Sequence, residues 1–168
     1  QLEDELRALG FTNDMSEGAP VCRWVYCGIR VDVMPTEGAV LGFHNRWYPD
    51  GVTHAVEVSL PDGERVAVFS VPYLLASKVE AFHDRGRGDY FASPDMEDII
   101  ALLDGCPEAE ERVAAAPEVV RGYLAEEFGK LLADGQFAPS VEGHMPGAAG
   151  PGRVERCLAI MRRIAGGM

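Results

Sequence analysis

One aspartate stands between two valines in a stretch that otherwise has the composition of a β-strand, Val31-Asp32-Val33. A carboxylate inside a strand is disfavoured by β propensity and by the cost of removing its charge from water. Asp32 therefore either faces water on an open side of a sheet, paired with Arg30, or is a metal ligand held on a rigid strand. The second interpretation predicts Mg²⁺, which binds one or two carboxylates together with waters and substrate phosphates.

A second set of ionisable residues lies along one predicted helix and at the start of the next. Lys78 and Arg85 are seven residues apart, which is about two turns, so both lie on one side of the helix. Asp95 directly follows Ser93-Pro94, where the next helix is expected to begin. These residues are either ordinary surface ion pairs, worth ~0–1 kcal/mol each, or a phosphate clamp. In the clamp, the two cations hold a triphosphate and Asp95 orients the groups around it.

The hydrophobic pattern predicts mainly strands in the first part of the chain and helices in the second. Apolar residues mark two hairpins, one over residues 21–34 that turns at Cys27-Gly28 and one over residues 55–70 that turns at 61–63. From Pro72 the apolar period changes to that of helices. We expect helices at residues 2–9, 72–85, from 94 onward, 107–116, 117–133 and 154–164, and loops at 36–52 and 138–152. A sheet followed by helices is typical of the α+β class.

Composition limits the class of protein. With 168 residues, 47% of them hydrophobic, the chain suits one domain or a compact pair of subdomains, and wholesale disorder is excluded. A net charge of −12 argues against a protein that coats nucleic acid by bulk charge. The four cysteines form no Cys-x-x-Cys pair and no zinc-type spacing, and no apolar run approaches the ~20 residues of a membrane span. We therefore expect a protein of the reducing cytoplasm with no membrane partner.

Other residues that could do chemistry are scattered. The histidines lie in different predicted elements, and nothing pairs them as metal ligands or as the base for a nucleophile: His44, His54, His83 and His144. The last predicted helix carries a patch of four arginines that could contact RNA, although a solvated helix face is the simpler explanation: Arg153, Arg156, Arg162 and Arg163.

Three stretches together form a recognisable order: Val31-Asp-Val-Met-Pro35, Leu41-Gly-Phe-His-Asn-Arg-Trp-Tyr48, and the segment from Pro72 to Ile99. The last contains Lys78-x-x-Ala-x-x-x-Arg85 on a helix, followed by Asp95-x-x-Asp98-Ile, and this combination is the most specific part. The order resembles the nucleotidyltransferase-like proteins of the AbiEii/AbiGii toxin family, within the polymerase-beta-like nucleotidyltransferases. The resemblance spans roughly residues 20–105.

The resemblance implies a mixed or antiparallel nucleotidyltransferase sheet with flanking helices over residues 1–71 and a helical subdomain over residues 72–168. It also implies a reaction in which an acceptor hydroxyl attacks the α-phosphate of a nucleoside triphosphate while Mg²⁺ stabilises the attacking and leaving oxygens. Asp32 matches the metal-binding catalytic carboxylate nearest the attacking hydroxyl, and Asp95 is the second catalytic candidate. Lys78 would hold the triphosphate, with Arg85 and Asp98 completing the nucleotide pocket. The implied partners are tRNA or another RNA, or a protein hydroxyl, and an antitoxin protein.

Proteins of that family carry a Gly-Ser motif and then an Asp-x-Asp or Asp-x-Glu pair on a strand, before the helix that corresponds to residues 2–9. No Gly-Ser dipeptide occurs in the 168 residues. We expect that segment upstream of Gln1 in a complete protein, which would then be a metal-dependent nucleotidyltransferase. One alternative is a non-catalytic binding or interaction module that kept the fold without the full metal site, which the acidic net charge favours. Another is a toxin core that a bound partner keeps inactive.

Overall fold

The structure is a computed structural model that describes residues 2–36, 45–145, 147 and 151–166. Helices and antiparallel strands are both present, so the predicted α+β class is confirmed. The chain divides into two compact units, Gln1–His44 and Asn45–Met168. Each unit is described separately below.

The first unit contains a short helix and a small sheet. Helix α1 (Leu2–Ala8) precedes β1 (Thr12–Asn13), β2 (Arg23–Tyr26) and β3 (Ile29–Asp32), which pair antiparallel in the order β1-β2-β3. The predicted hairpin turn is confirmed: Tyr26 lies opposite Ile29, and Cys27 and Gly28 have φ values of 48° and 80°. Positive φ at both central residues is the geometry of the tight turns that join twisted strands. Trp24 is the one buried hydrophobic side chain among the described residues of this unit.

The second unit begins with a helix and a separate hairpin. Helix α2 (Tyr48–Thr53) is followed by β4 (Val56–Ser59) and β5 (Arg65–Val68), an antiparallel pair with Gly63 at φ +91° in its turn, as the sequence predicts. Val56 and Val58 lie opposite Val68 and Val66, so the four valines share one face of the hairpin. All four are exposed. The described strands therefore form two small antiparallel sheets.

The prediction of a loop over residues 36–52 is wrong for the last part of this range, because α2 forms there. Pro49 lies in the first turn of α2, where a fixed φ favours helix and no N–H is lost. Asn45 holds the preceding segment, because its side chain accepts a hydrogen bond from the Trp47 N–H at 3.1 Å and donates to the Ser77 carbonyl at 2.7 Å. Residues 37–44, and with them His44 and the first half of the predicted Leu41–Tyr48 motif, lie outside the described residues.

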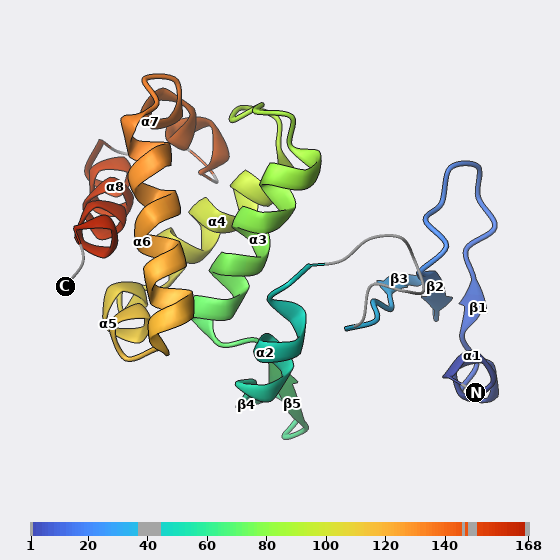
Figure 1. Cartoon of the computed structure of the whole chain (residues 1–168). Helices are drawn as coiled ribbons and strands as arrows, with labels where there is room; N and C mark the ends of the chain where they lie inside the picture. Colours follow the sequence, from blue (N-terminus) through green and yellow to red (C-terminus); the bar gives the residue numbers. More distant parts are fainter. Residues whose placement is uncertain (1, 37–44, 146, 148–150, 167–168) are drawn as a thin grey trace. The chain divides into compact units, whose positions relative to one another are not determined.

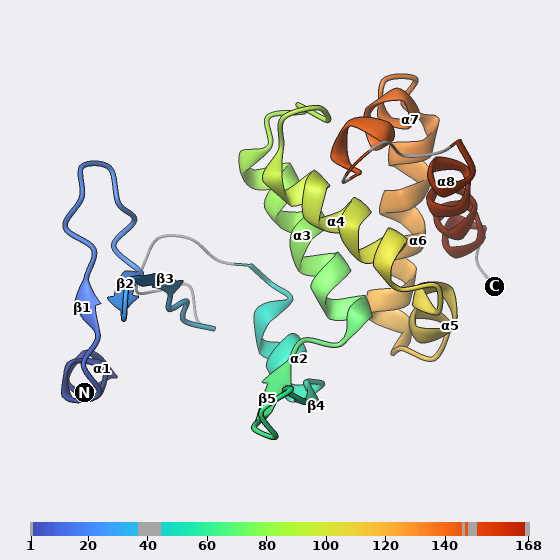
Figure 2. The same cartoon turned by 180° about the vertical axis from the view of Figure 1, so that it is seen from behind.

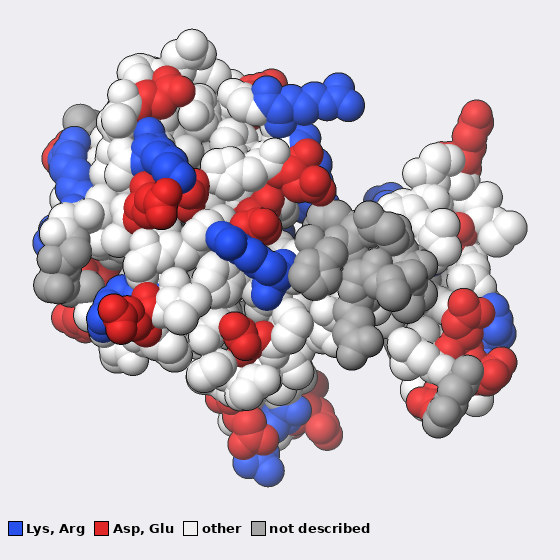
Figure 3. Space-filling model, in the orientation of Figure 1, with Lys and Arg blue, Asp and Glu red and all other residues white. Residues whose placement is uncertain are grey.

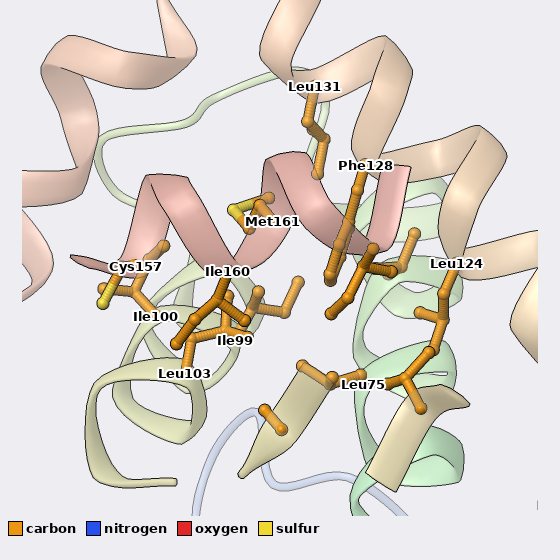
Figure 4. Close-up of a cluster of buried hydrophobic side chains, with 14 of the residues drawn as sticks. Leu75, Ile99, Ile100, Leu103, Leu124, Phe128, Leu131, Cys157, Ile160 and Met161 are labelled. Atoms are coloured by element: carbon orange, nitrogen blue, oxygen red, sulfur yellow. The ribbon is translucent and has the colours of Figure 1, made fainter. Parts of the chain in front are cut away.

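Helices build the rest of the second unit (Figures 1 and 2). They are α3 (Val71–Arg85), α4 (Pro94–Gly105), α5 (Ala109–Ala114), α6 (Glu118–Ala133), α7 (Phe137–Ser140), the 3₁₀ turn η1 (Val141–His144) and α8 (Pro151–Ala165). Helix α3 packs against α4 and α6, and α8 packs against α6. Figure 4 shows the core between them, to which Leu75 of α3, Ile99 of α4, Phe128 of α6 and Met161 of α8 all contribute.

The loop predicted at residues 138–152 is also partly wrong, because α7 and η1 occupy its first half. Phe137 and Val141 are fully buried, and their burial against the helical core outweighs the Gly- and Pro-rich composition of the segment.

The arginines of the last helix are paired with acidic side chains. Arg153 and Arg156 both contact Asp104 of α4, and Arg163 contacts Glu110 of α5. Arg162 lies 2.6 Å from Glu155 on α8 itself. These pairs attach α8 to α4 and α5, which supports the simpler explanation of the arginine patch as a helix face.

The predicted boundary at residue 71 differs from the boundary between the compact units, which follows His44. Residues 45–70 group with the helices because α2 contacts α3 directly. The ring of His54 stacks on Tyr73 of α3 with 4.8 Å between ring centroids. None of the helices formed by the described residues combines the length and apolar character needed to cross a membrane.

Candidate functional site

Arg85 and Asp95 join the end of α3 to the start of α4. The guanidinium Nε and Nη2 of Arg85 donate to the two carboxylate oxygens of Asp95 at 2.7 and 2.6 Å. The Asp95 side chain is only 1% exposed, whereas that of Arg85 is 57% exposed. The hydrogen bonds from Arg85 to Asp95 raise the pKa of the guanidinium, which therefore stays charged. This pairing holds a buried carboxylate against a cation that still faces water.

Lys78 extends this pair into a four-residue group, named here the α3–α4 cluster. Lys78 Nζ lies 2.5 Å from Asp98 Oδ2 and 3.6 Å from Asp95 Oδ1. Asp95 thus contacts both cations, and Asp98 holds the lysine from one turn further along α4. The structure brings together four of the five predicted site residues, namely Lys78, Arg85, Asp95 and Asp98.

The local sequence explains why α4 begins where it does. Ser93 is the N-cap, with extended backbone angles, and its hydroxyl accepts a hydrogen bond from the Met96 N–H at 3.4 Å. Pro94 follows in the first turn, as the sequence predicts. Asp95 then lies in the first turn of a twelve-residue helix, where the positive end of the helix dipole favours a carboxylate.

A cavity of about 380 Å³ lies beside the α3–α4 cluster, between the end of α3 and the first turn of α4. Arg85 and Asp95 line it, together with Arg87 and Asp89 of the connecting loop. The Asp89 carboxylate shapes that loop by accepting hydrogen bonds from the N–H groups of Phe91 and Ala92 at 2.9 and 3.0 Å.

Arg87 is a candidate that sequence reasoning missed. It is exposed, lines this cavity, and has φ +51°, a conformation that is uncommon for a residue other than glycine. The signal available in the sequence was the Gly86-Arg87-Gly88 triplet, because flanking glycines permit the tight loop that turns an arginine toward the start of α4.

The chemistry that this arrangement favours is the binding of phosphate oxygens. The Nε and Nη2 atoms of Arg85 donate to Asp95, whereas Nη1 makes no hydrogen bond within the described parts of the chain. Lys78 keeps 29% of its side chain exposed. Two cations held in fixed positions by carboxylates lose little freedom when they bind an anion, and arginine suits phosphate because its donors are planar and paired.

Asp32, the fifth predicted residue, lies in the first unit and is held by an arginine. Arg23 Nε and Nη2 donate to its two oxygens at 2.7 and 2.8 Å. The hydrogen bonds from Arg23 lower the pKa of the Asp32 carboxyl. The prediction that Asp32 pairs with Arg30 is wrong. Arg23 lies directly across the β2–β3 ladder from Asp32, where side chains of neighbouring strands approach most closely. Arg30 is two positions away from Asp32 on the same strand.

The magnesium expected from the resemblance has no group of three protein ligands among the described residues. Within residues 2–36, 45–145, 147 and 151–166, no three Asp, Glu, His or Cys side chains are grouped so that they could hold a metal ion. Both oxygens of Asp32 already accept hydrogen bonds from Arg23. Magnesium at Asp32 stays a prediction.

The described histidines are engaged separately. His83 Nε2 lies 2.6 Å from Glu127 Oε2, and His144 Nε2 lies 2.5 Å from the Tyr90 carbonyl oxygen. On the face drawn in Figure 3, basic and acidic side chains of the second unit alternate, in keeping with these and the other ion pairs.

Comparison with known proteins gave no match: no family model, no curated protein and no solved structure is significantly similar to this chain.

Proposed function

We propose that the protein is nucleotidyltransferase-like and that its α3–α4 cluster binds the phosphates of a nucleoside triphosphate. The single observation that supports this proposal is the convergence of Lys78, Arg85 and Asp95 at 3.6 Å or less beside a cavity of about 380 Å³. These are the residues on which the sequence resemblance depends, and they come from two helices. Arg85 and Lys78 supply charged donors to the phosphate oxygens, and Asp95 and Asp98 hold these two cations in place.

The reaction we propose is transfer of a nucleotide to an RNA hydroxyl, of tRNA above all, or to a protein hydroxyl. The acceptor hydroxyl loses its proton to solvent and its oxygen bonds to the α-phosphorus. The bond from that phosphorus to the oxygen bridging it to the β-phosphate breaks, and pyrophosphate leaves with the bridging oxygen. In a toxin–antitoxin pair, an antitoxin protein would control this activity. All four cysteines are free thiols, which favours the cytoplasm as the site of action.

A second candidate is a binding module that holds nucleotide without transferring it. The observation that favours it is the Arg23–Asp32 pair, in which the predicted catalytic carboxylate makes a two-hydrogen-bond contact with a guanidinium. A carboxylate so engaged has to leave Arg23 before it can bind a metal or activate a hydroxyl.

Nucleotide binding is tested by replacing, one at a time, the two lysines of the sequence, Lys78 and Lys130. Fluorescent analogues of ATP, GTP, CTP and UTP are titrated with Mg²⁺ into the unmodified protein, Lys78→Ala and Lys130→Ala. We expect Lys78→Ala to bind at least ~10-fold more weakly, because a charge-assisted contact to phosphate is lost. Lys130, paired with Glu126 and Glu127 on α6, is the matched control and should bind normally. Absence of saturable binding, or equal loss in both variants, contradicts the proposal.

Transfer is tested separately by incubating the protein with labelled triphosphates, Mg²⁺ and tRNA. Label on the RNA that is lost in Asp32→Ala supports the transferase. Saturable nucleotide binding without label transfer supports the binding module instead.

A further inference from the structure

A second cavity lies at the start of α3, whereas the cavity beside the α3–α4 cluster lies at the end of that helix. It has a volume of about 330 Å³, between the end of α2, the start of β4, the first turn of α3 and the connection from α5 to α6. Tyr73 in this cavity and Arg85 in the cluster are twelve residues apart on α3, which corresponds to about 18 Å along a helix axis. Lys78 of the cluster is nearer, five residues from Tyr73, but the two cavities share no lining residue and are therefore distinct.

Two helices begin at this cavity. Ser70, the N-cap of the fifteen-residue α3, and Pro117, the N-cap of the sixteen-residue α6, both line it. Neither residue caps its helix with a side-chain hydrogen bond. The first N–H groups of a helix have no partner within the helix, and the helix dipole places partial positive charge there. The cavity therefore receives the positive ends of two helices.

Two side chains add donors to the same space. Arg112 lines the cavity and is exposed, and its guanidinium makes no hydrogen bond or ion pair with any residue that the structure describes. Tyr73 also lines it and is only 3% exposed, yet its hydroxyl has no hydrogen-bond partner in the described segments. Among the described residues, Trp47 Nε1 is the one side-chain polar atom that is both fully buried and without a hydrogen-bond partner. The Tyr73 hydroxyl, which also lacks a partner, therefore keeps some exposed surface. Tyr73 thus brings a polar group without a protein partner to the wall of the cavity.

The surroundings of Tyr73 keep its hydroxyl available as a donor. Burial, and to a smaller extent the charge of Asp50, raises the pKa of the Tyr73 hydroxyl, which therefore stays protonated near neutral pH. His54 stacks on its ring at an interplanar angle of 19° and fixes the ring in place. Val56 and Val71 supply apolar walls.

We propose that this second cavity is a binding site for the oxyanion group, phosphate or carboxylate, of a small molecule with a compact apolar part. Arg112 and the Tyr73 hydroxyl donate to the anion, and the first turns of α3 and α6 supply N–H groups. The valine walls accommodate the apolar part. The volume suits a molecule of metabolite size, near the lower end of the range for small-molecule pockets.

The test uses two probes, inorganic phosphate and benzoate, each titrated at constant ionic strength into the whole protein. Backbone amide resonances of Val71, Tyr73 and Glu118 report on the two helix starts. The same titrations are made on Arg112→Gln and on Tyr73→Phe, which keeps the ring that His54 stacks on. Arg65→Gln, an exposed arginine of β5 that does not line the cavity, is the matched control.

We expect saturable shifts at these amides with at least one probe, weakened at least ~10-fold by Arg112→Gln or Tyr73→Phe and unchanged in Arg65→Gln. A response to phosphate alone identifies a phosphate ligand, and a response to benzoate alone a carboxylate; either supports the site. No saturable shift with either probe overturns the proposal, as does binding that is equal in all variants. Binding lost in Lys78→Ala but kept in Arg112→Gln also overturns it, because the signal then belongs to the α3–α4 cluster.

Discussion

The guanidinium of Arg85 donates two hydrogen bonds, of 2.7 and 2.6 Å, to the buried carboxylate of Asp95. The two residues are ten positions apart and belong to successive helices. Because Asp95 also lies 3.6 Å from Lys78, one buried carboxylate contacts both cations proposed to bind phosphate, while Asp98 lies closer to the lysine at 2.5 Å. The contact therefore links the packing of α3 on α4 to the chemistry of the cavity beside them.

Replacing Asp95 with asparagine should destabilise the second unit. We expect a loss of roughly 1–2 kcal/mol in the free energy of unfolding, since two charge-assisted hydrogen bonds weaken but the orphaned Arg85 can still reach water. Urea denaturation measures it. Asp98→Asn is the control, because Asp98 is 51% exposed and should cost under about 1 kcal/mol. Equal costs for the two variants would show that burial of Asp95 has no structural importance.

Arg87→Ala should weaken nucleotide binding without affecting stability. Arg87 is exposed and lines the cavity beside the cluster, so its loss removes a phosphate donor while leaving the core intact. We expect roughly three- to tenfold weaker binding of the fluorescent triphosphates. Thermal unfolding is measured in parallel, and a large fall in melting temperature would instead assign Arg87 a structural role in the loop.

Gly86→Ala should be destabilising and Gly129→Ala stabilising. A Cβ on Gly86 would lie 2.6 Å from the carbonyl oxygen of Phe82 and 2.4 Å from its ring, so the end of α3 has to shift, at a cost of about 1–3 kcal/mol. Gly129 lies inside α6 with nothing within 4 Å of its would-be Cβ. Alanine there should add about 0.5–1 kcal/mol. Chemical denaturation of the two variants checks both signs, and stabilisation by Gly86→Ala would contradict the geometry.

The attachment of α8 should weaken in acid. Hydrogen bonds from Arg153, and then from Arg156, hold the pKa of Asp104 below its ordinary value of 3.8, against the opposing effect of burial. Because the folded pKa is the lower one, this stabilisation is present at neutral pH and is lost as the pH falls below about 4. We expect Asp104→Asn to lower the melting temperature by about 2–4 °C at neutral pH.

That difference in melting temperature between Asp104→Asn and the unmodified protein should shrink as the pH falls from about 7 to 3. Calorimetry across this range measures it. A difference that stays constant with pH would show that the charge of Asp104 does not contribute.

Local signals in the sequence predicted much of the fold. The Cys27-Gly28 turn, the hairpin turn at Gly63 and the start of α4 at Ser93-Pro94 all depend on backbone preferences of a few adjacent residues, and all three are confirmed. Phe137 and Val141 show where such signals fail, because a short helix in a Gly- and Pro-rich segment exists only through burial against distant helices.

In the candidate site too, local sequence signals predicted some positions, and contacts between distant residues determined the others. Seven-residue spacing on one helix placed Lys78 and Arg85 on the same side, and the helix start placed Asp95 near the end of α3. The partner of Asp32 could not be predicted, because the choice of Arg23 over Arg30 depends on which residues of β2 and β3 lie opposite each other. The position of Arg87 depends on a positive φ that no periodicity reports.

Nearly all of the buried apolar side chains described above belong to residues 45–165, and Trp24 stands alone before them. Amide protons should therefore exchange with deuterated solvent in two separate regimes. Those of α6, whose Leu124 and Phe128 have no exposed surface, should be released only when the helical unit unfolds globally. The amide protons of β1 to β3 should exchange through small local openings, at rates many orders of magnitude faster than those of α6. No single protection factor then describes the chain.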